Sequence, residues 1–233
     1  MRHVPTVRLL ALVGVLSCGG KRSPHPAPGP RLTGELEAEL AAVQAAPLDA
    51  IGNGGKSTLP YVLRRGDKLA LAGPDGVARL LNESADARLP RAARLAMLQI
   101  LGYSTDGGAD AALIQALNAP VLRPLAAYLL GRARRWGYPE RPRDRHAILR
   151  ALRPHLEDAT TYDDPWRASD PVTTGDLALA AFVAVAGPAR FVETGVSESI
   201  GLGMPHFDAP LRAALVRACK AVDVDAVPRS PIP

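Results

Sequence analysis

The sequence predicts an all-α protein. From Thr33 onward, apolar residues recur at helical spacing, and Gly, Pro or Asn interrupts each helical stretch. No segment alternates apolar and polar residues well enough to predict a sheet. Of the 233 residues, 47% are apolar and 4% are aromatic, which suits a folded domain packed with Ala and Leu and excludes a wholly disordered chain.

The first half of this domain contains three predicted helices. Pro47 ends the first, Gly102 caps the second and Asn118 with Pro120 closes the third, while Asp86 is expected to cap the start of the second. The apolar residues that define the three helices are Leu36, Leu40 and Val43, then Leu95, Leu98 and Leu101, and then Leu113, Ile114 and Leu117.

The second half contains four more predicted helices. Five alanines make the apolar run from Leu177 to Ala186 a buried helix rather than a strand, with Asp176 as its expected cap and Gly187 after it. Asp208 is expected to cap the last helix, in which Pro210 fills the first turn. The apolar residues of the other helices are Leu122, Leu125, Ala126 and Leu129, then Leu149, Leu152 and Leu156, and finally Leu211, Leu215, Ala218 and Val222.

One segment, Asn118 to Gly131 (NAPVLRPLAAYLLG), resembles the second helix of a HEAT repeat. Arg94 and Gly102 have the spacing of Arg123 and Gly131, and the expected caps Asp86, Asn118 and Asp208 are separated by 32 and 90 residues. This resemblance implies a HEAT-like or armadillo-like, right-handed α-solenoid of a few helix pairs. An irregular helical bundle is the alternative.

The N-terminus carries an export signal. Arg2 and Arg8 precede the apolar run from Leu9 to Leu16, and the segment ending at Cys18 resembles the lipobox of bacterial lipoproteins. That resemblance implies palmitate or a similar lipid on Cys18 and anchoring to the cell envelope, with Gly19 indicating the outer membrane and the periplasmic side. Cleavage by an ordinary signal peptidase, giving a soluble secreted protein, is the alternative. The expected division is a signal peptide at 1–17, a tether at 18–32, a helical domain at 33–224 and a C-terminal tail at 225–233.

Two motifs suggest catalysis, but each lacks a structural feature that its chemistry requires. The segment from Ala50 to Ser57 (AIGNGGKS) resembles a phosphate-binding loop, but no apolar strand precedes it, so we expect a Gly-rich turn with Ser57 or Thr58 capping the next helix. The segment from Gly195 to Ser199 (GVSES) lacks the second Gly of a hydrolase elbow. A cryptic hydrolase that uses Ser197 or Ser199 with His206 and Asp208 is the alternative function. No metal-binding spacing is present, and we expect no cofactor and no enzymatic activity.

An arginine-rich segment, residues 123–153, is the most informative charged feature, with nine arginines against Glu140 and Asp144. The simplest interpretation is that these arginines pair with the acidic stretch at 157–176. The alternative is an anionic partner, either an envelope protein or an anionic envelope component. Nucleic acid is not expected, because residues 1–31 hold five basic residues and the rest of the chain is balanced at 23 basic and 23 acidic. The candidate partner-binding residues are Arg132, Arg135, Trp136, Arg141, Arg143 and Arg145.

The sequence therefore predicts a lipid-anchored envelope protein that acts as an interaction scaffold or adaptor. If the loop from Trp136 to Arg145 is an exposed contact surface, replacing Arg141, Arg143 and Arg145 by Ala weakens partner capture without lowering thermal stability.

Overall fold

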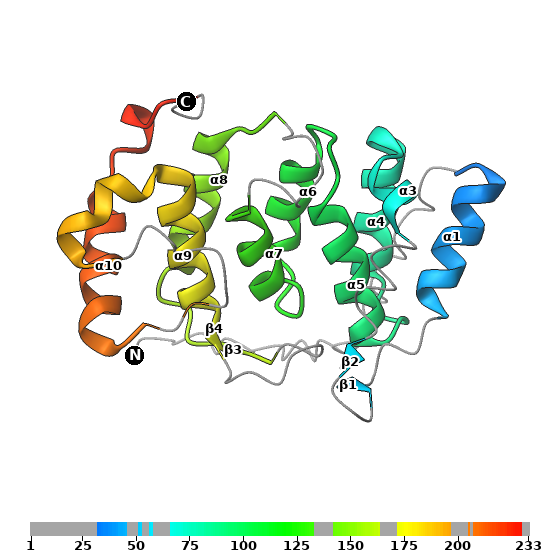
Figure 1. The fold of residues 1–233 in the computed structure, drawn as a ribbon, viewed down its shortest axis with the longest axis horizontal. Coiled ribbons are helices and arrows are strands. Elements are labelled where there is room, and N and C mark those ends of the chain that lie inside the picture. The colour runs from blue at the N-terminus through cyan, green and yellow to red at the C-terminus, as the bar shows by residue number, and fades with distance from the viewer. Residues whose placement is uncertain are drawn as a thin grey trace, which may run out of the picture.

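The computed structural model describes residues 32–45, 51–52, 56–57, 66–132, 142–163, 172–196, 205 and 207–229. Over these residues the chain is mainly helical, which confirms the predicted all-α class. The helices follow one another along the long axis of the molecule, from α1 at one end to α10 at the other (Figure 1). They are α1 (Gly34–Gln44), α3 (Asp67–Ala70), α4 (Gly73–Ala85), α5 (Arg91–Gly102), α6 (Ala109–Ala116), α7 (Arg123–Leu130), α8 (Arg145–Leu152), α9 (Thr174–Ala186) and α10 (Ala209–Ala221).

Short 3₁₀ helices and two small hairpins complete the described elements. The 3₁₀ helices are η1 (Arg153–His155), η2 (Pro188–Thr194) and η3 (Val224–Ala226). Strands β1 (Ile51–Gly52) and β2 (Lys56–Ser57) pair antiparallel, as do β3 (Thr161–Tyr162) and β4 (Val172–Thr173). The registers place Ile51 opposite Ser57 and Thr161 opposite Thr173. The sequence predicts no sheet, because two-residue strands are too short to show an alternation of apolar and polar residues. Ser57 lies in β2, and Thr58, the other expected cap, lies outside the described residues.

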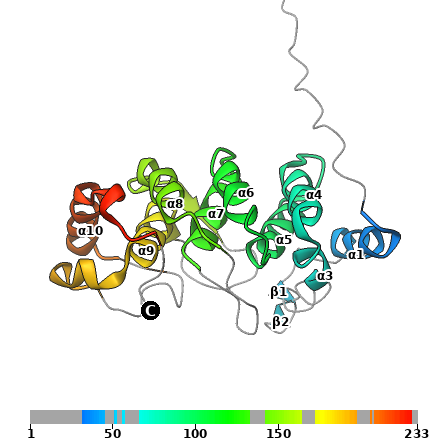
Figure 2. The same ribbon diagram turned by 90° about the horizontal axis from the view of Figure 1, so that it is seen from above.

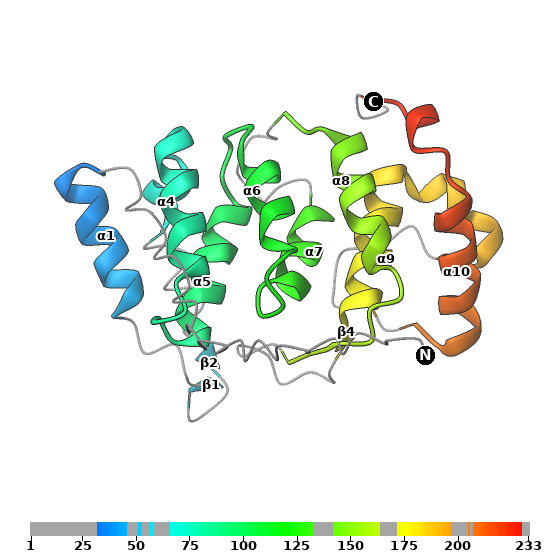
Figure 3. The same ribbon diagram turned by 180° about the vertical axis from the view of Figure 1, so that it is seen from behind.

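The helices form two parallel rows. One row contains α4, α6 and α8, and the other contains α5, α7 and α9 (Figure 2). Across the rows, α4 packs on α5, α6 on α7 and α8 on α9, and neighbours within each row also touch. Figure 3 shows the molecule from the side of the α4, α6 and α8 row. Successive helix pairs therefore stack along the chain, an arrangement that suits the predicted solenoid; the HEAT resemblance itself stays a prediction.

The row of α5, α7 and α9 carries most of the core. Every residue of α7 from Pro124 to Leu130 is buried, and so is every residue of α9 from Thr174 to Val183. A helix that is apolar all round is stable only when neighbours cover all of its faces. The run from Leu177 to Ala186 accordingly lies in a helix, as predicted.

The structure confirms only some of the helix caps that the sequence predicts. The carboxylate of Asp208 accepts the Leu211 N–H at 2.8 Å and caps α10 as predicted. By contrast, α9 is capped by Thr173, whose hydroxyl accepts the Asp176 N–H at 3.1 Å. Asp176 lies in the first turn of that helix, where its carboxylate forms an ion pair.

Two other expected caps are wrong. Asp86 ends α4 instead of starting α5, and its carboxylate accepts the backbone N–H of Arg88 at 2.9 Å. Asn118 does not cap α7, because Leu122 holds the N-cap position of that helix and no side chain caps it. The spacing of the expected caps therefore does not measure a structural repeat.

A different pair of residues does hold equivalent positions. Nε of Arg94, in the first turns of α5, donates to the carbonyl of Ser84 near the end of α4 at 2.9 Å. Nε of Arg123, at the start of α7, donates to the carbonyl of Leu117 just after α6 at 2.8 Å. In both helix pairs an arginine of the second helix binds a carbonyl at the end of the first, where backbone acceptors lack helical partners.

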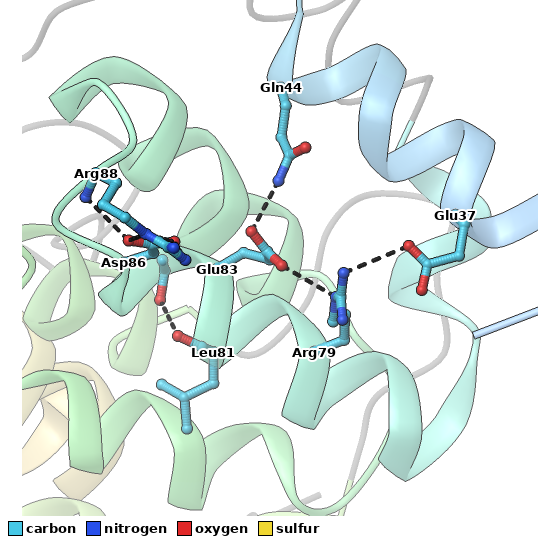
Figure 4. A network of polar contacts seen from close by, with 8 residues as sticks. Glu37, Gln44, Arg79, Leu81, Glu83, Asp86 and Arg88 are labelled. Atoms are coloured by element: carbon cyan, nitrogen blue, oxygen red, sulfur yellow. Dashed lines mark hydrogen bonds and ion pairs between the residues drawn. The ribbon is translucent and has the colours of Figure 1, made fainter. Parts of the chain in front are cut away.

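Polar contacts dock α1 at its end of the array. Arg79 of α4 lies between Glu37 of α1 (Nη2 to Oε2, 3.4 Å) and Glu83 of its own helix (Nε to Oε1, 3.0 Å) (Figure 4). Glu83 also accepts a hydrogen bond from Nε2 of Gln44 at 2.7 Å. Leu40 and Val43 of α1 are buried beneath this network, so the predicted first helix belongs to the fold.

Candidate functional site

The predicted partner-binding residues divide between described and undescribed parts of the chain. Arg132, Arg143 and Arg145 are described, whereas Arg135, Trp136 and Arg141 lie outside the described residues, as does Cys18. The Arg132 guanidinium lies over the ring of Tyr128, 4.6 Å from its centroid, a cation–π contact at the end of α7.

The guanidinium of Arg143 is nearly buried and holds three elements together. Its Nε lies 3.0 Å from Oδ2 of Asp110, a buried carboxylate in α6, and its Nη2 donates to the carbonyl of Leu130 at 2.6 Å. These contacts tie the segment before α8 to the start of α6 and the end of α7. These contacts make a loss of stability the expected result of replacing Arg143, in contrast to the expectation from the sequence, because the replacement removes an ion pair to a buried carboxylate.

Arg145, the first residue of α8, likewise makes contacts within the molecule. Its Nε donates to the carbonyl of Val185 in α9 at 2.8 Å, and its Nη1 donates to the carbonyl of Pro228 at 3.1 Å. Burial lowers the pKa of its guanidinium, and the positive charges of Arg190 and Arg143 lower that pKa further. Several arginines thus concentrate positive charge around the start of α8.

The C-terminal segment, residues 222–229, packs along α8. The buried His146 bonds through Nε2 to the carbonyl of Val227 at 2.7 Å. Arg150 forms an ion pair with Asp225, and Arg153 donates to the carbonyl of Val222. Arg145, His146 and Arg150 of α8 and Arg153 of η1 thus hold this segment, so the folded part continues beyond the boundary expected at residue 224.

This packing creates a basic hollow, which we call the arginine pocket. Its volume is about 300 Å³, and it is lined by Gly107, Pro142, Arg143, Asp144, Arg145 and Arg229. Its wall therefore brings together three arginines and one aspartate from two separate parts of the chain, and Gly107 from a third. Asp144 caps α8, and its Oδ1 accepts the Ala147 N–H at 3.0 Å.

Two exposed arginines in this region have no ion-pair partner among the described residues. Arg229 on the pocket wall and Arg190 in η2 are both exposed, and neither forms an ion pair with another described residue. Neither residue was predicted, because both lie far from the arginine-rich segment in sequence. Only the C-terminal packing and the turn after α9 bring them near Arg145.

The predicted pairing of the arginine-rich segment with the acidic stretch at 157–176 is observed only in part. Arg123 pairs with Asp158 of the acidic stretch at 3.1 Å, as expected. Other partners lie elsewhere: Arg143 pairs with Asp110, Arg150 pairs with Asp225, and Asp176 pairs with Arg212. Each of these pairs joins separate elements instead of neighbours across one helical turn.

A second polar cluster surrounds the 3₁₀ turn after α8. Burial lowers the pKa of His155, the charge of Arg123 adds to this effect, and Asp158 opposes it. Asp158 also accepts the backbone N–H of Thr160 at 2.9 Å. The bonds of this cluster fix the turn that leads to β3.

The other candidate sites gain no support. Asp208 of the alternative hydrolase caps α10, while Ser197, Ser199 and His206 lie outside the described residues. Among the residues that the structure describes, no group of three His, Cys, Asp or Glu side chains could hold a metal ion. A further hollow of about 360 Å³ between α4 and α6 has only uncharged walls, with Asn82, Gln115 and Asn118 as its polar residues.

The described helices include none with both the length and the apolar character that crossing a bilayer requires. Comparison of the chain with protein-family models, with curated proteins and with solved structures finds no match in any of the three.

Proposed function

We propose that this protein is a lipid-anchored scaffold or adaptor of the cell envelope. In this proposal Cys18 carries the lipid, residues 18–32 form a tether, and the helical array holds a partner protein at a distance from the membrane. The lipobox-like leader and the Pro- and Gly-rich tether support the anchoring. Export to the outer membrane, with the array in the periplasm, follows from the same leader.

The observation that carries the binding role is the exposed positive charge at the arginine pocket, which has no ion-pair partner at Arg229 or Arg190 among the described residues. Most described arginines are bound inside the molecule, but Arg229 and Arg190 present exposed guanidinium groups beside the partly buried Arg145. Exposed arginines are frequent anchors of protein interfaces, because one guanidinium can make several directed hydrogen bonds. An elongated array that leaves such residues exposed suits binding rather than catalysis.

The anchoring half of the proposal is tested with paired cysteine variants. Cells that produce the full chain are labelled with a palmitate analogue and separated into membrane and soluble fractions. C18S is expected to abolish labelling and to release the protein from the membrane fraction. C219A, which removes a buried thiol, is expected to retain both. Equal labelling of wild type and C18S would contradict the anchor.

The binding half is tested by crosslinking in the native cells. A photo-crosslinking amino acid placed at Arg229 is expected to give a discrete adduct with a partner protein. The same amino acid at Arg217, an exposed arginine of α10 outside the pocket, is expected to give none. Identical adduct patterns at both positions, or none at either, would contradict a scaffold that binds through this surface.

A further inference from the structure

The arginine pocket has the donors that an oxyanion needs. Arg229 is exposed, lines the pocket and makes no hydrogen bond with another described residue. Arg143 uses Nε and Nη2 for Asp110 and Leu130, which leaves its Nη1 unused among the described contacts. A guanidinium matches a carboxylate in shape and can bind both of its oxygens at once.

The charged residues that line the pocket are mainly positive, which favours an anionic ligand. Three arginines stand against Asp144, whose carboxylate is held by the α8 backbone. At the start of α8, the Ala147 N–H is already used by this cap. Arg190 lies outside the pocket wall yet close enough to Arg145 to lower its pKa. The positive surface therefore extends beyond the hollow.

The size of the pocket fits a side chain better than a large cofactor. A volume of about 300 Å³ corresponds to roughly ten water molecules at about 30 Å³ each, enough for a carboxylate on a short aliphatic stem. Because positive charge continues to Arg190, a ligand with several carboxylates along a chain can use more of this surface than an isolated ion can.

We infer that the arginine pocket binds a glutamate or aspartate side chain within an acidic segment of a partner protein, with Arg229 as the principal contact. This inference rests on the proposed scaffold function and names the chemistry of its partner. Neighbouring carboxylates of the same segment lie toward Arg190. Arg143 and Arg145 position the site, since their other bonds fix the pocket wall.

The experiment uses the full-length C18S chain and a fluorescent peptide of alternating Ser and Glu, with binding followed by anisotropy. R229E is expected to weaken binding about tenfold or more, because it replaces a charge-assisted hydrogen bond with repulsion. R229K, which keeps the charge but loses the planar fork, is expected to fall between R229E and wild type. R217E is the matched control and is expected to bind as wild type does. Arg229 makes no hydrogen bond or ion pair with another described residue, so thermal unfolding of R229E is expected to match that of wild type.

Three outcomes would overturn the inference. Equal weakening by R229E and R217E would show non-specific attraction to a basic surface. Equal binding of a peptide with Gln in place of Glu would show that carboxylates are not recognised. Displacement of the peptide by inorganic phosphate at equal molar concentration would assign the pocket to a small phosphate instead.

Failure of the inference can be told apart from failure of the proposed function. If the acidic peptide does not bind but crosslinking at Arg229 still captures a partner, the scaffold stands and the ligand chemistry is wrong. If Cys18 carries no lipid, the anchor fails, while the peptide measurement on the C18S chain is unaffected.

Discussion

Gly131 lies so close to Ala181 that a Cβ atom on Gly131 would stand 2.7 Å from the Ala181 Cα. Gly131 ends α7, and its φ of −74° is open to any residue, so the backbone conformation does not require glycine there. The requirement comes from α9, which approaches α7 too closely for a side chain. Gly102 is similar but milder, since its Cβ would meet the ends of the flexible Leu129 side chain, 2.7 Å away.

G131A is therefore expected to lower the free energy of unfolding by about 1–3 kcal/mol, the usual cost of overpacking a core. G34A is the matched control, because a Cβ on Gly34 meets nothing within 4 Å. It is expected to change stability by less than about 0.5 kcal/mol. Urea denaturation followed by circular dichroism measures both. Equal stability of the two variants would show that α7 and α9 are not packed this closely.

The ion pair of Arg143 and Asp110 is expected to dominate the stability of the α6–α8 junction. R143M removes the ion pair between Arg143 and the buried Asp110 carboxylate, and the expected loss is about 3–5 kcal/mol. R150A removes an ion pair whose two side chains are 59% and 74% exposed, so the expected loss is below about 1 kcal/mol. Thermal or chemical unfolding that ranks R150A as the more damaging change would refute this assignment.

Asp86 is expected to titrate at unusually low pH. The hydrogen bond from the Arg88 side chain, and then that from the Arg88 backbone, lower the pKa of Asp86 from 3.8 to about 2. Because the folded-state pKa is the lower one, this contact stabilises the fold above about pH 4 and is lost as the pH falls toward 2.

The measurement is the pH titration of the Asp86 carboxyl signal by NMR. R88A removes the side-chain bond but keeps the backbone N–H, so the pKa of Asp86 is expected to rise only part of the way toward 3.8. R217A serves as the comparison and is expected to leave this titration unchanged. An unchanged Asp86 pKa in R88A would exclude the Arg88 side chain as its main cause.

The thiol of Cys219 is expected to be inert while the protein is folded. It is fully buried in α10, and burial raises its pKa to about 12, with Arg153 opposing the shift. Relative to an ordinary thiol, this lowers the thiolate fraction at pH 8 on the order of a thousandfold. In the C18S chain, alkylation at Cys219 should therefore follow global unfolding. Rapid labelling in the folded state would show that α10 opens independently.

The sequence predicted most helices but missed α4. The segment begins with Gly73 and Pro74 and contains Gly76, residues that normally argue against a helix interior. A Cβ on Gly76 would lie 2.6 Å from the carbonyl oxygen of Leu69, so this glycine serves the close packing of α3 on α4. A contact of that kind leaves no periodic signal in the sequence.

The arginine-rich segment shows the same limit for the candidate site. Its charge was evident from the sequence, but Arg143 and Arg145 face inward to Asp110 and Val185. Two exposed arginines, Arg229 on the pocket wall and Arg190 outside it, come from other parts of the chain. The sequence gives the number of charged residues. The partner of each charge depends on which backbone carbonyls and carboxylates lie near it after folding.

By itself, the sequence determined the all-α class and the positions of most helices, because helical spacing and helix breakers act over a few neighbouring residues. Only the tertiary structure decided how the helices pair and which arginines remain exposed. It also decided that the C-terminal segment would complete the arginine pocket beside α8. These features depend on contacts between residues such as Arg145 and Pro228, 83 positions apart, where close packing and the desolvation of charge select one arrangement.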